Sequence, residues 1–123
     1  MDRVLKITPS ERVAGDPTPG IAREQAFASD HLWAGLARTE SGVVSGWHHH
    51  GDNETTVYVE AGAFRIEFGP GGSEVVEGEP GDFLVIGKGV VHRESNPSDE
   101  ESRLILFRTG TGPPTINVDG PSE

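Results

Sequence analysis

Turn-forming residues interrupt this chain along its whole length, and they limit the folds that it can adopt. The 123 residues include 17 glycines and nine prolines, spread without a fixed period. Such a distribution is typical of short strands joined by tight turns, and it argues against long helices. A chain of this length forms one hydrophobic core, so we expect a single all-β domain over residues 1–123, either a barrel or a sandwich.

The clearest strand is expected from Ala63 to Phe68, where apolar and charged residues alternate. Two continuous apolar runs, Phe83–Ile86 and Leu104–Phe107, are predicted to be strands covered on both faces. Further strands are expected at 4–7, 21–29, 31–39, 43–50, 55–61, 73–77 and 90–93. The glycine- and proline-rich tail, residues 110–123, contains Thr115–Val118, which could add an edge strand, either within the chain or to a partner subunit.

Charge and the absence of cysteine exclude several classes of function. The net charge of −10 argues against a nucleic-acid partner and against binding to an anionic membrane surface. Without cysteine there are no disulfides, thiolate ligands or cysteine nucleophiles, so any metal must be bound by nitrogen or oxygen. No segment approaches the roughly 20 apolar residues that span a bilayer, and we expect a soluble cytoplasmic protein with no membrane partner.

Three of the five histidines are consecutive, at positions 48 to 50. On a strand, His48 and His50 project to one face and His49 to the other, so His48 and His50 can act as a bidentate metal clamp. Taken alone, the triplet could equally be an exposed polar loop. His92 on its own would likewise be interpreted as a structural residue. His31 has no partner nearby in the sequence and is also interpreted as structural.

The two histidine stretches together resemble the two motifs of the cupin superfamily. The opening of the first motif, G-x5-H-x-H-x3-4-E-x6-G, is matched in residues 42–62 by Gly42, His48 and His50, and Glu54 has the shorter of the two spacings from His50. The second, G-x5-P-x-G-x2-H-x3-N, is matched in residues 81–96 by Gly81, Gly89, His92 and Asn96, with Gly87 in the place of proline. This resemblance implies a small single-domain cupin with the double-stranded β-helix (jelly-roll) barrel.

The resemblance also implies that His48, His50 and His92 point into the barrel and bind a divalent transition metal. Imidazole ligands suit iron, manganese, nickel, copper or zinc, so the metal is not identified. The acidic ligand has two possible positions. Glu54 has the family's spacing from His50, but counting back from Gly62 places Thr55 at that position, because the motif is one residue too long.

Two sites therefore remain open. A bulge could turn Glu54 inward to complete a site of three histidines and one glutamate, or the site has three histidines and Glu54 lies outside it. Glu94 shares the strand face of His92, but because an acidic run follows closely we expect it to be solvated.

For function, the resemblance implies a metal-dependent dioxygenase or isomerase that acts on a small organic molecule. The alternative is a non-catalytic module that binds a small molecule or sugar. A metal-free structural barrel is disfavoured, because burying three imidazoles without partners would cost stability. Small cupins often dimerise through edge strands, so we expect a homodimer.

Overall fold

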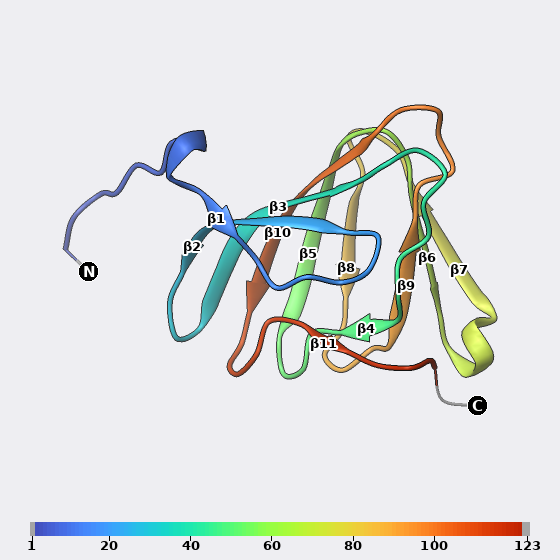
Figure 1. The fold of residues 1–123 in the computed structure, drawn as a ribbon. Coiled ribbons are helices and arrows are strands. Elements are labelled where there is room, and N and C mark those ends of the chain that lie inside the picture. The colour runs from blue at the N-terminus through green and yellow to red at the C-terminus, as the bar shows by residue number, and fades with distance from the viewer. Residues whose placement is uncertain (1, 122–123) are drawn as a thin grey trace.

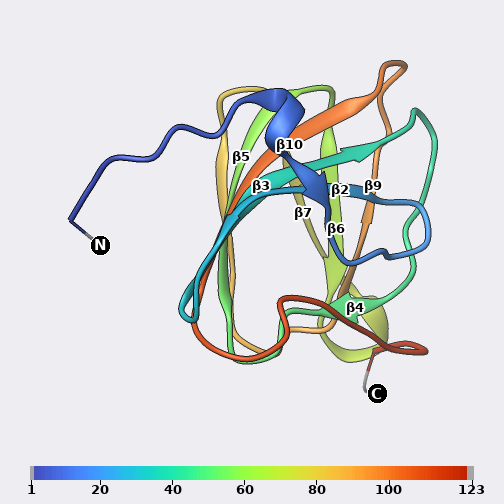
Figure 2. The same cartoon turned by 60° about the vertical axis from the view of Figure 1, so that its left-hand side comes forward.

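The computed structural model describes residues 2–121 and consists of two antiparallel sheets that face each other (Figures 1 and 2). One sheet has six strands in the order β1-β2-β3-β10-β5-β8, and the other has five in the order β11-β4-β9-β6-β7. The strands are β1 (Val13–Ala14), β2 (Ala22–Ala28), β3 (Leu32–Thr39), β4 (His48–His49), β5 (Glu54–Ala61), β6 (Phe64–Phe68), β7 (Glu74–Gly78), β8 (Phe83–Ile86), β9 (His92–Ser95), β10 (Ser102–Thr109) and β11 (Ile116–Asn117). The expected all-β jelly roll is confirmed.

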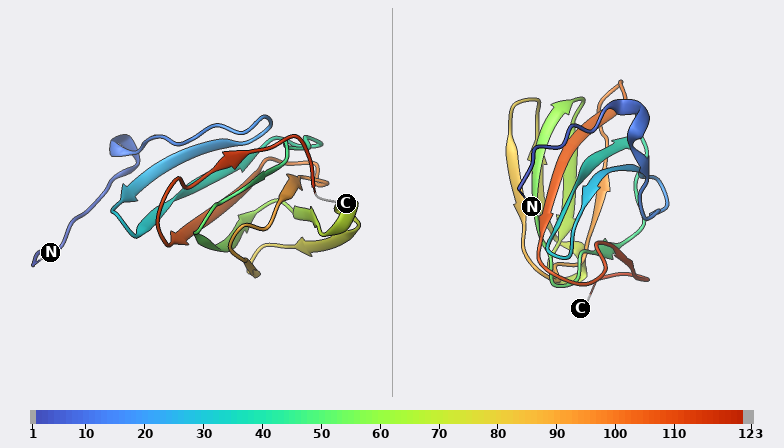
Figure 3. Two further views of the ribbon diagram at one scale, coloured as in Figure 1. Left: turned by 90° about the horizontal axis from the view of Figure 1, so that it is seen from below. Right: turned by 90° about the vertical axis from the view of Figure 1, so that its left-hand side faces the viewer.

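Helical structure within residues 2–121 is limited to two single 3-10 turns, η1 (Pro9–Glu11) and η2 (Pro70–Gly72). No helix in this part of the chain is long and apolar enough to cross a membrane. The segment before β1 runs away from both sheets, as the view from below shows (Figure 3, left). Residues 4–7, predicted to form a strand, lie in this segment and are not one; the side chain of Val4 is almost fully exposed and has no strand to pair with.

Of the strand predicted over residues 43–50, only His48–His49 (β4) forms regular strand structure. Gly46 donates its N–H to the carbonyl oxygen of Pro19, so this part of the backbone turns aside from the sheet. Val44 makes only an isolated bridge to Ser95. The chain thus reaches the histidines through an irregular segment and enters the sheet at His48.

The inward faces of β5 and β10 change from apolar to polar along the barrel. Val59 lies opposite Leu104 and Val57 opposite Leu106, and these four side chains belong to the buried hydrophobic core. The next inward pair along the two strands is Thr55 opposite Arg108. One end of the barrel is therefore filled by aliphatic side chains, and polar side chains are buried toward the other.

Gly62 closes the first motif at the turn between β5 and β6. Its φ angle is +73°, a left-handed conformation that favours glycine, and a Cβ atom there would lie 2.7 Å from the Cα of Ser102. The turn thus requires glycine for both its backbone conformation and its close approach to β10.

The two apolar runs are strands, but the prediction that both of their faces are covered is wrong. Phe83 and Val85 of β8 are 70% and 65% exposed, and Phe107 of β10 is 48% exposed. They alternate with buried residues, because the outer face of the six-stranded sheet has no layer packed on it within residues 2–121.

The tail contains the edge strand expected within Thr115–Val118, but this strand pairs inside the chain and not with a partner subunit. Residues 116 and 117 form β11, which pairs with β4 of the same chain, Ile116 opposite His49 and Asn117 opposite His48. Figure 1 shows the two short strands side by side near the lower end of the barrel. The tail therefore completes the edge of its own five-stranded sheet.

Candidate metal centre

Four buried side chains converge inside the barrel: His48, His50, His92 and Glu94. Their potential ligand atoms all lie within 4.8 Å of one another. His48 of β4 is directly opposite His92 of β9, and Glu94 follows on the same face of β9. We call these four residues the metal group, because such a set could hold a metal ion.

Each histidine of the group is oriented by a main-chain carbonyl. The Nδ1 atoms lie 2.8–3.0 Å from the carbonyl oxygens of Gly46 for His48, Pro114 for His50 and Val90 for His92. A carbonyl oxygen only accepts hydrogen bonds, so Nδ1 carries the proton in each neutral ring. The lone pair is then on Nε2, the atom that can bind a metal.

The Nε2 atoms of the three histidines are buried and have no hydrogen-bond partner among residues 2–121. Glu94 Oε1 lies 3.5 Å from Nε2 of His92 and 3.7 Å from Nε2 of His48. Four acceptors that face one another repel unless a cation lies between them, and one proton can satisfy only one pair. A divalent cation can be bound by all four, so the donor set fits iron, manganese, nickel, copper or zinc.

The electrostatic environment keeps His48 and His50 in the neutral form that binds metals. Burial, reinforced by the charge of Arg108, lowers the pKa of His50 to about 2. Burial also lowers the pKa of His48, although Glu94 opposes this shift. Burial would raise the pKa of Glu94, but contact with His48 and His92 when their Nε2 atoms carry a proton outweighs that effect and holds the pKa well below its usual value. Near neutral pH an ionised Glu94 thus lies beside neutral His48 and His50.

Glu54, one of the two candidates for the acidic ligand, lies outside the metal group. It is the exposed first residue of β5, and Thr55 is the residue buried on the inward face. The pairing of β5 with β10 is continuous from residue 54 to residue 59, so no bulge turns Glu54 inward. The structure therefore follows the register counted back from Gly62.

Glu94 takes the acidic position, and the expectation that it is solvated is wrong, since only 6% of its surface is exposed. β9 continues to Ser95, and the alternation of the strand turns Glu94 inward with His92. Ser45 fixes this strand by donating its N–H to the Glu94 carbonyl and accepting the Glu94 N–H on its hydroxyl. The shared face with His92 is the sequence signal that identifies this residue.

The other two histidines are not part of the group. His49 is partly exposed, and its Nδ1 accepts a hydrogen bond from the N–H of Gly51. His31 is exposed, and its Nδ1 lies 2.8 Å from Oδ1 of Asp30.

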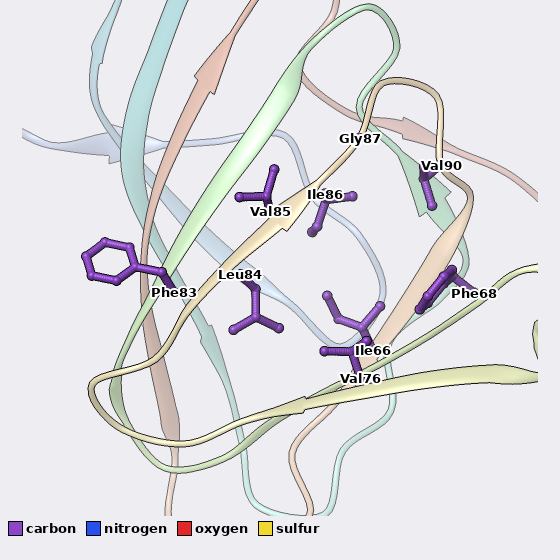
Figure 4. A pocket seen from close by; sticks show the side chains of 9 residues that line it. All are labelled: Ile66, Phe68, Val76, Phe83, Leu84, Val85, Ile86, Gly87 and Val90. Atoms are coloured by element: carbon purple, nitrogen blue, oxygen red, sulfur yellow. The ribbon is translucent and has the colours of Figure 1, made fainter.

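An apolar pocket of about 270 Å³ opens where β8, an edge strand of the six-stranded sheet, lies near β6 and β7 of the other sheet. Figure 4 shows Leu84 and Ile86 of β8 on one side and Ile66, Phe68 and Val76 on the other. Cross-strand pairing connects this pocket to the barrel interior. Phe68 is opposite His92 of the metal group, and Ile86 is opposite the buried Thr55. The pocket can take the apolar part of a small molecule.

Comparisons with known proteins agree with this architecture. KdgF from Halomonas sp. is 25% identical and the alignment covers 84% of this chain and 93% of that one, with a TM-score of 0.65. An RmlC-like cupin from Shewanella frigidimarina is 19% identical, with coverages of 90% and 96% and a TM-score of 0.67. An uncharacterized conserved protein with a double-stranded β-helix domain, from Klebsiella pneumoniae, is 17% identical, with coverages of 85% and 90% and a TM-score of 0.70.

No curated protein matches the sequence. The family model of the cupin domain matches residues 35–108, which is more than half of the chain and includes all four residues of the metal group. The chain therefore belongs to the cupin family.

Proposed function

We propose that His48, His50, His92 and Glu94 bind one divalent transition-metal ion, and that the protein acts there on a small organic molecule by dioxygenase- or isomerase-type chemistry. The observation that carries this proposal is the convergence of three buried, unpartnered Nε2 atoms on one carboxylate. A metal with open positions can act as a Lewis acid or bind both a chelating substrate and dioxygen.

The protein's own groups have two roles in this proposal. The carbonyls of Gly46, Val90 and Pro114 hold the three rings with Nε2 directed inward. The apolar pocket at the edge of the barrel admits the organic part of the substrate.

A metal analysis tests the proposed site. We expect close to one transition-metal ion per chain in protein produced with iron, manganese, nickel, copper and zinc available, measured by elemental analysis. Changing His48, His50 or His92 to Ala, or Glu94 to Gln, should weaken metal binding by at least about 10–100-fold. Losses of roughly that size follow when only a hydrogen-bond partner of a metal ligand is changed, and these four residues are the proposed ligands themselves. Glu54→Gln is the matched control and should keep its metal, because Glu54 is exposed.

Two results would contradict the site. One is wild-type protein that contains no metal and takes none up on reconstitution. The other is loss of metal from Glu54→Gln with retention in Glu94→Gln.

The second candidate function is a binding module without turnover, which the same apolar pocket supports. Oxygen consumption and product formation over a panel of catechols, diketones, thiols and sugars separates the two. Turnover that is lost together with the metal supports an enzyme, whereas saturable binding of an unchanged ligand supports a module.

We also propose that the protein is a homodimer. Aromatic and aliphatic side chains gather on the outer face of the six-stranded sheet, where Phe83 contacts Tyr58 with ring centroids 5.0 Å apart and Phe107 is half exposed on β10. An exposed apolar face of this kind is typical of an interface.

A further inference from the structure

Two positive charges are buried in the barrel near the metal group. Arg108 of β10 is 2% exposed and Arg23 of β2 is 6% exposed. The guanidinium carbon of Arg108 lies 4.6 Å from the ring centroid of Trp33, so its side chain is held against the inner wall of the six-stranded sheet. Neither arginine forms an ion pair with any residue in the part of the chain that the structure describes.

Arg108 lacks acceptors for its hydrogen-bond donors. Its Nη1 atom is buried and has no partner. Its Nε atom lies 3.2 Å from Nδ1 of His50, but that nitrogen donates its proton to the carbonyl oxygen of Pro114 at 2.9 Å. One nitrogen cannot donate to Pro114 and accept from Arg108 at once, so the metal-binding tautomer of His50 leaves Arg108 Nε without an acceptor.

Arg23 is better satisfied. Its Nη1 donates to the carbonyl oxygen of Asp16 and to the hydroxyl of Thr18, although its Nε is buried without a partner. These acceptors are neutral, so they bind the guanidinium without cancelling its charge.

The charges inside the barrel do not balance. Guanidinium groups stay protonated at neutral pH, so Arg108 and Arg23 both carry a positive charge. Glu94 is the only buried carboxylate among residues 2–121, and it faces two histidines of the metal group. A bound divalent metal would add further positive charge. Buried charges are stable when they are paired, and the partner missing here is an anion.

A second unpartnered polar atom lies beside Arg108. Thr55 is directly opposite Arg108 in the pairing of β5 with β10, both side chains point inward, and Oγ1 of Thr55 is buried without a hydrogen bond. A guanidinium and a hydroxyl side by side can together donate to one carboxylate, which guanidinium groups bind with charge-assisted hydrogen bonds.

We propose that Arg108 and Thr55 form an anion subsite that binds the carboxylate of a small organic acid, while the rest of that molecule lies toward the metal group. This proposal rests on the proposed function, since its ligand is the molecule on which the metal centre acts. It assigns a substrate class, small carboxylates, and it makes Arg108 the residue that selects it.

Calorimetric titration of the protein, with metal content measured on each sample, tests the subsite directly. The probes are acetate, lactate, pyruvate and malonate, the neutral amides of the same acids, and inorganic phosphate. We expect at least one carboxylate to bind about tenfold or more tightly than its amide, because a hydrogen bond to a charged group is worth about 1.5–3 kcal/mol. Arg108→Gln should remove that preference.

Three further variants keep the result interpretable. Arg108→Lys keeps the charge without the planar fork and should bind the carboxylate severalfold more weakly than wild type. Thr55→Val should also bind it severalfold more weakly. Arg103→Gln is the matched control, because Arg103 lies on the same strand, points outward to Glu60 and should leave binding unchanged.

The outcomes separate this proposal from that of the metal centre. Carboxylate affinity that is the same in wild type, Arg108→Gln and Arg108→Lys, with normal metal content, overturns the subsite and leaves the metal centre standing. Amides that bind as well as acids, or phosphate as the only anion bound, also overturn it. If the wild type binds no metal, the metal proposal fails, and titration of that protein still decides whether carboxylates bind through Arg108.

Discussion

At the scale of single residues, the orientation of the three histidine rings of the metal group is set by hydrogen bonds from Nδ1. Their Nδ1 protons go to main-chain carbonyl oxygens, which no side-chain substitution removes directly. The rings are therefore held with Nε2 inward before any metal binds, and little ordering entropy remains to be lost on binding. His50 differs from the other two, because its Nδ1 also faces Arg108.

The low pKa of His50 predicts how the stability of the metal-free protein depends on pH. The pKa is about 2 in the folded state and 6.5 for an unperturbed histidine, so between these values the unfolded chain binds a proton that the folded chain does not. The free energy of unfolding should therefore fall as the pH is lowered below about 6.5, by about 1.4 kcal/mol per pH unit for this one residue. Urea denaturation between pH 7.5 and 5.0 measures the slope.

The variant His50→Gln should show a shallower slope over this range, and His31→Gln should match the wild type because His31 is exposed. A slope that is the same in His50→Gln and wild type would contradict the assignment to His50.

At the scale of elements, the shortest strands organise the site. β4 has two residues, yet it lies between β9, which carries His92 and Glu94, and β11, which follows the Pro114 carbonyl that orients His50. Asn53 ties the tail to this region by donating from its side-chain amide to the carbonyl oxygens of His50, Thr111 and Pro113. The tail is thus part of the support of the metal group.

A shortened chain tests this role of the tail. A protein ending at Gly112 loses both β11 and Pro114, and we expect its metal affinity to fall by about 10–100-fold, the usual cost of losing an outer partner of a ligand. A protein ending at Asp119 keeps β11 and should bind metal as the full chain does. Competition with a chelator of known affinity measures the difference, and circular dichroism checks that the barrel is intact. Equal affinities in the two folded proteins would show that the tail does not support the site.

At the scale of the whole molecule, the two faces of the six-stranded sheet are both apolar in part. The inner face packs in the core, whereas the outer face exposes Phe83, Val85 and Phe107 to solvent. Cross-strand pairing connects these residues through Tyr58, which lies opposite both Phe83 and Ile105. The exposed side chains thus form a continuous strip over three strands rather than isolated positions.

The homodimer proposed above should use this strip. Sedimentation velocity should give the mass of two chains for the wild type, and Phe107→Asp should shift the equilibrium to monomer because it places a charge in the apolar interface. Val44→Asp is the control, since Val44 is similarly exposed but lies on the irregular segment away from this face. A monomeric wild type, or dimers that Phe107→Asp leaves unchanged, would contradict the interface.

Local patterns in the sequence determined the fold class and most of the strands. Turn residues and period-two alternation act over a few neighbours, so β2, β3 and β5 to β10 could be located from sequence to within a few residues. The same alternation separated His48 and His50 from His49, and motif spacing added His92 as the third member of the predicted set.

Only the tertiary structure decided which groups meet. Glu94 and Glu54 both lie near the predicted histidine ligands in the sequence, and strand pairing places Glu94 on the inward face of β9 and Glu54 on the outward face of β5. The pairing of β11 with β4, and of Arg108 with Thr55, joins residues far apart in the chain, and no local pattern encodes such contacts. Strand alternation sets the face that a side chain takes, whereas its neighbours on that face depend on long-range pairing.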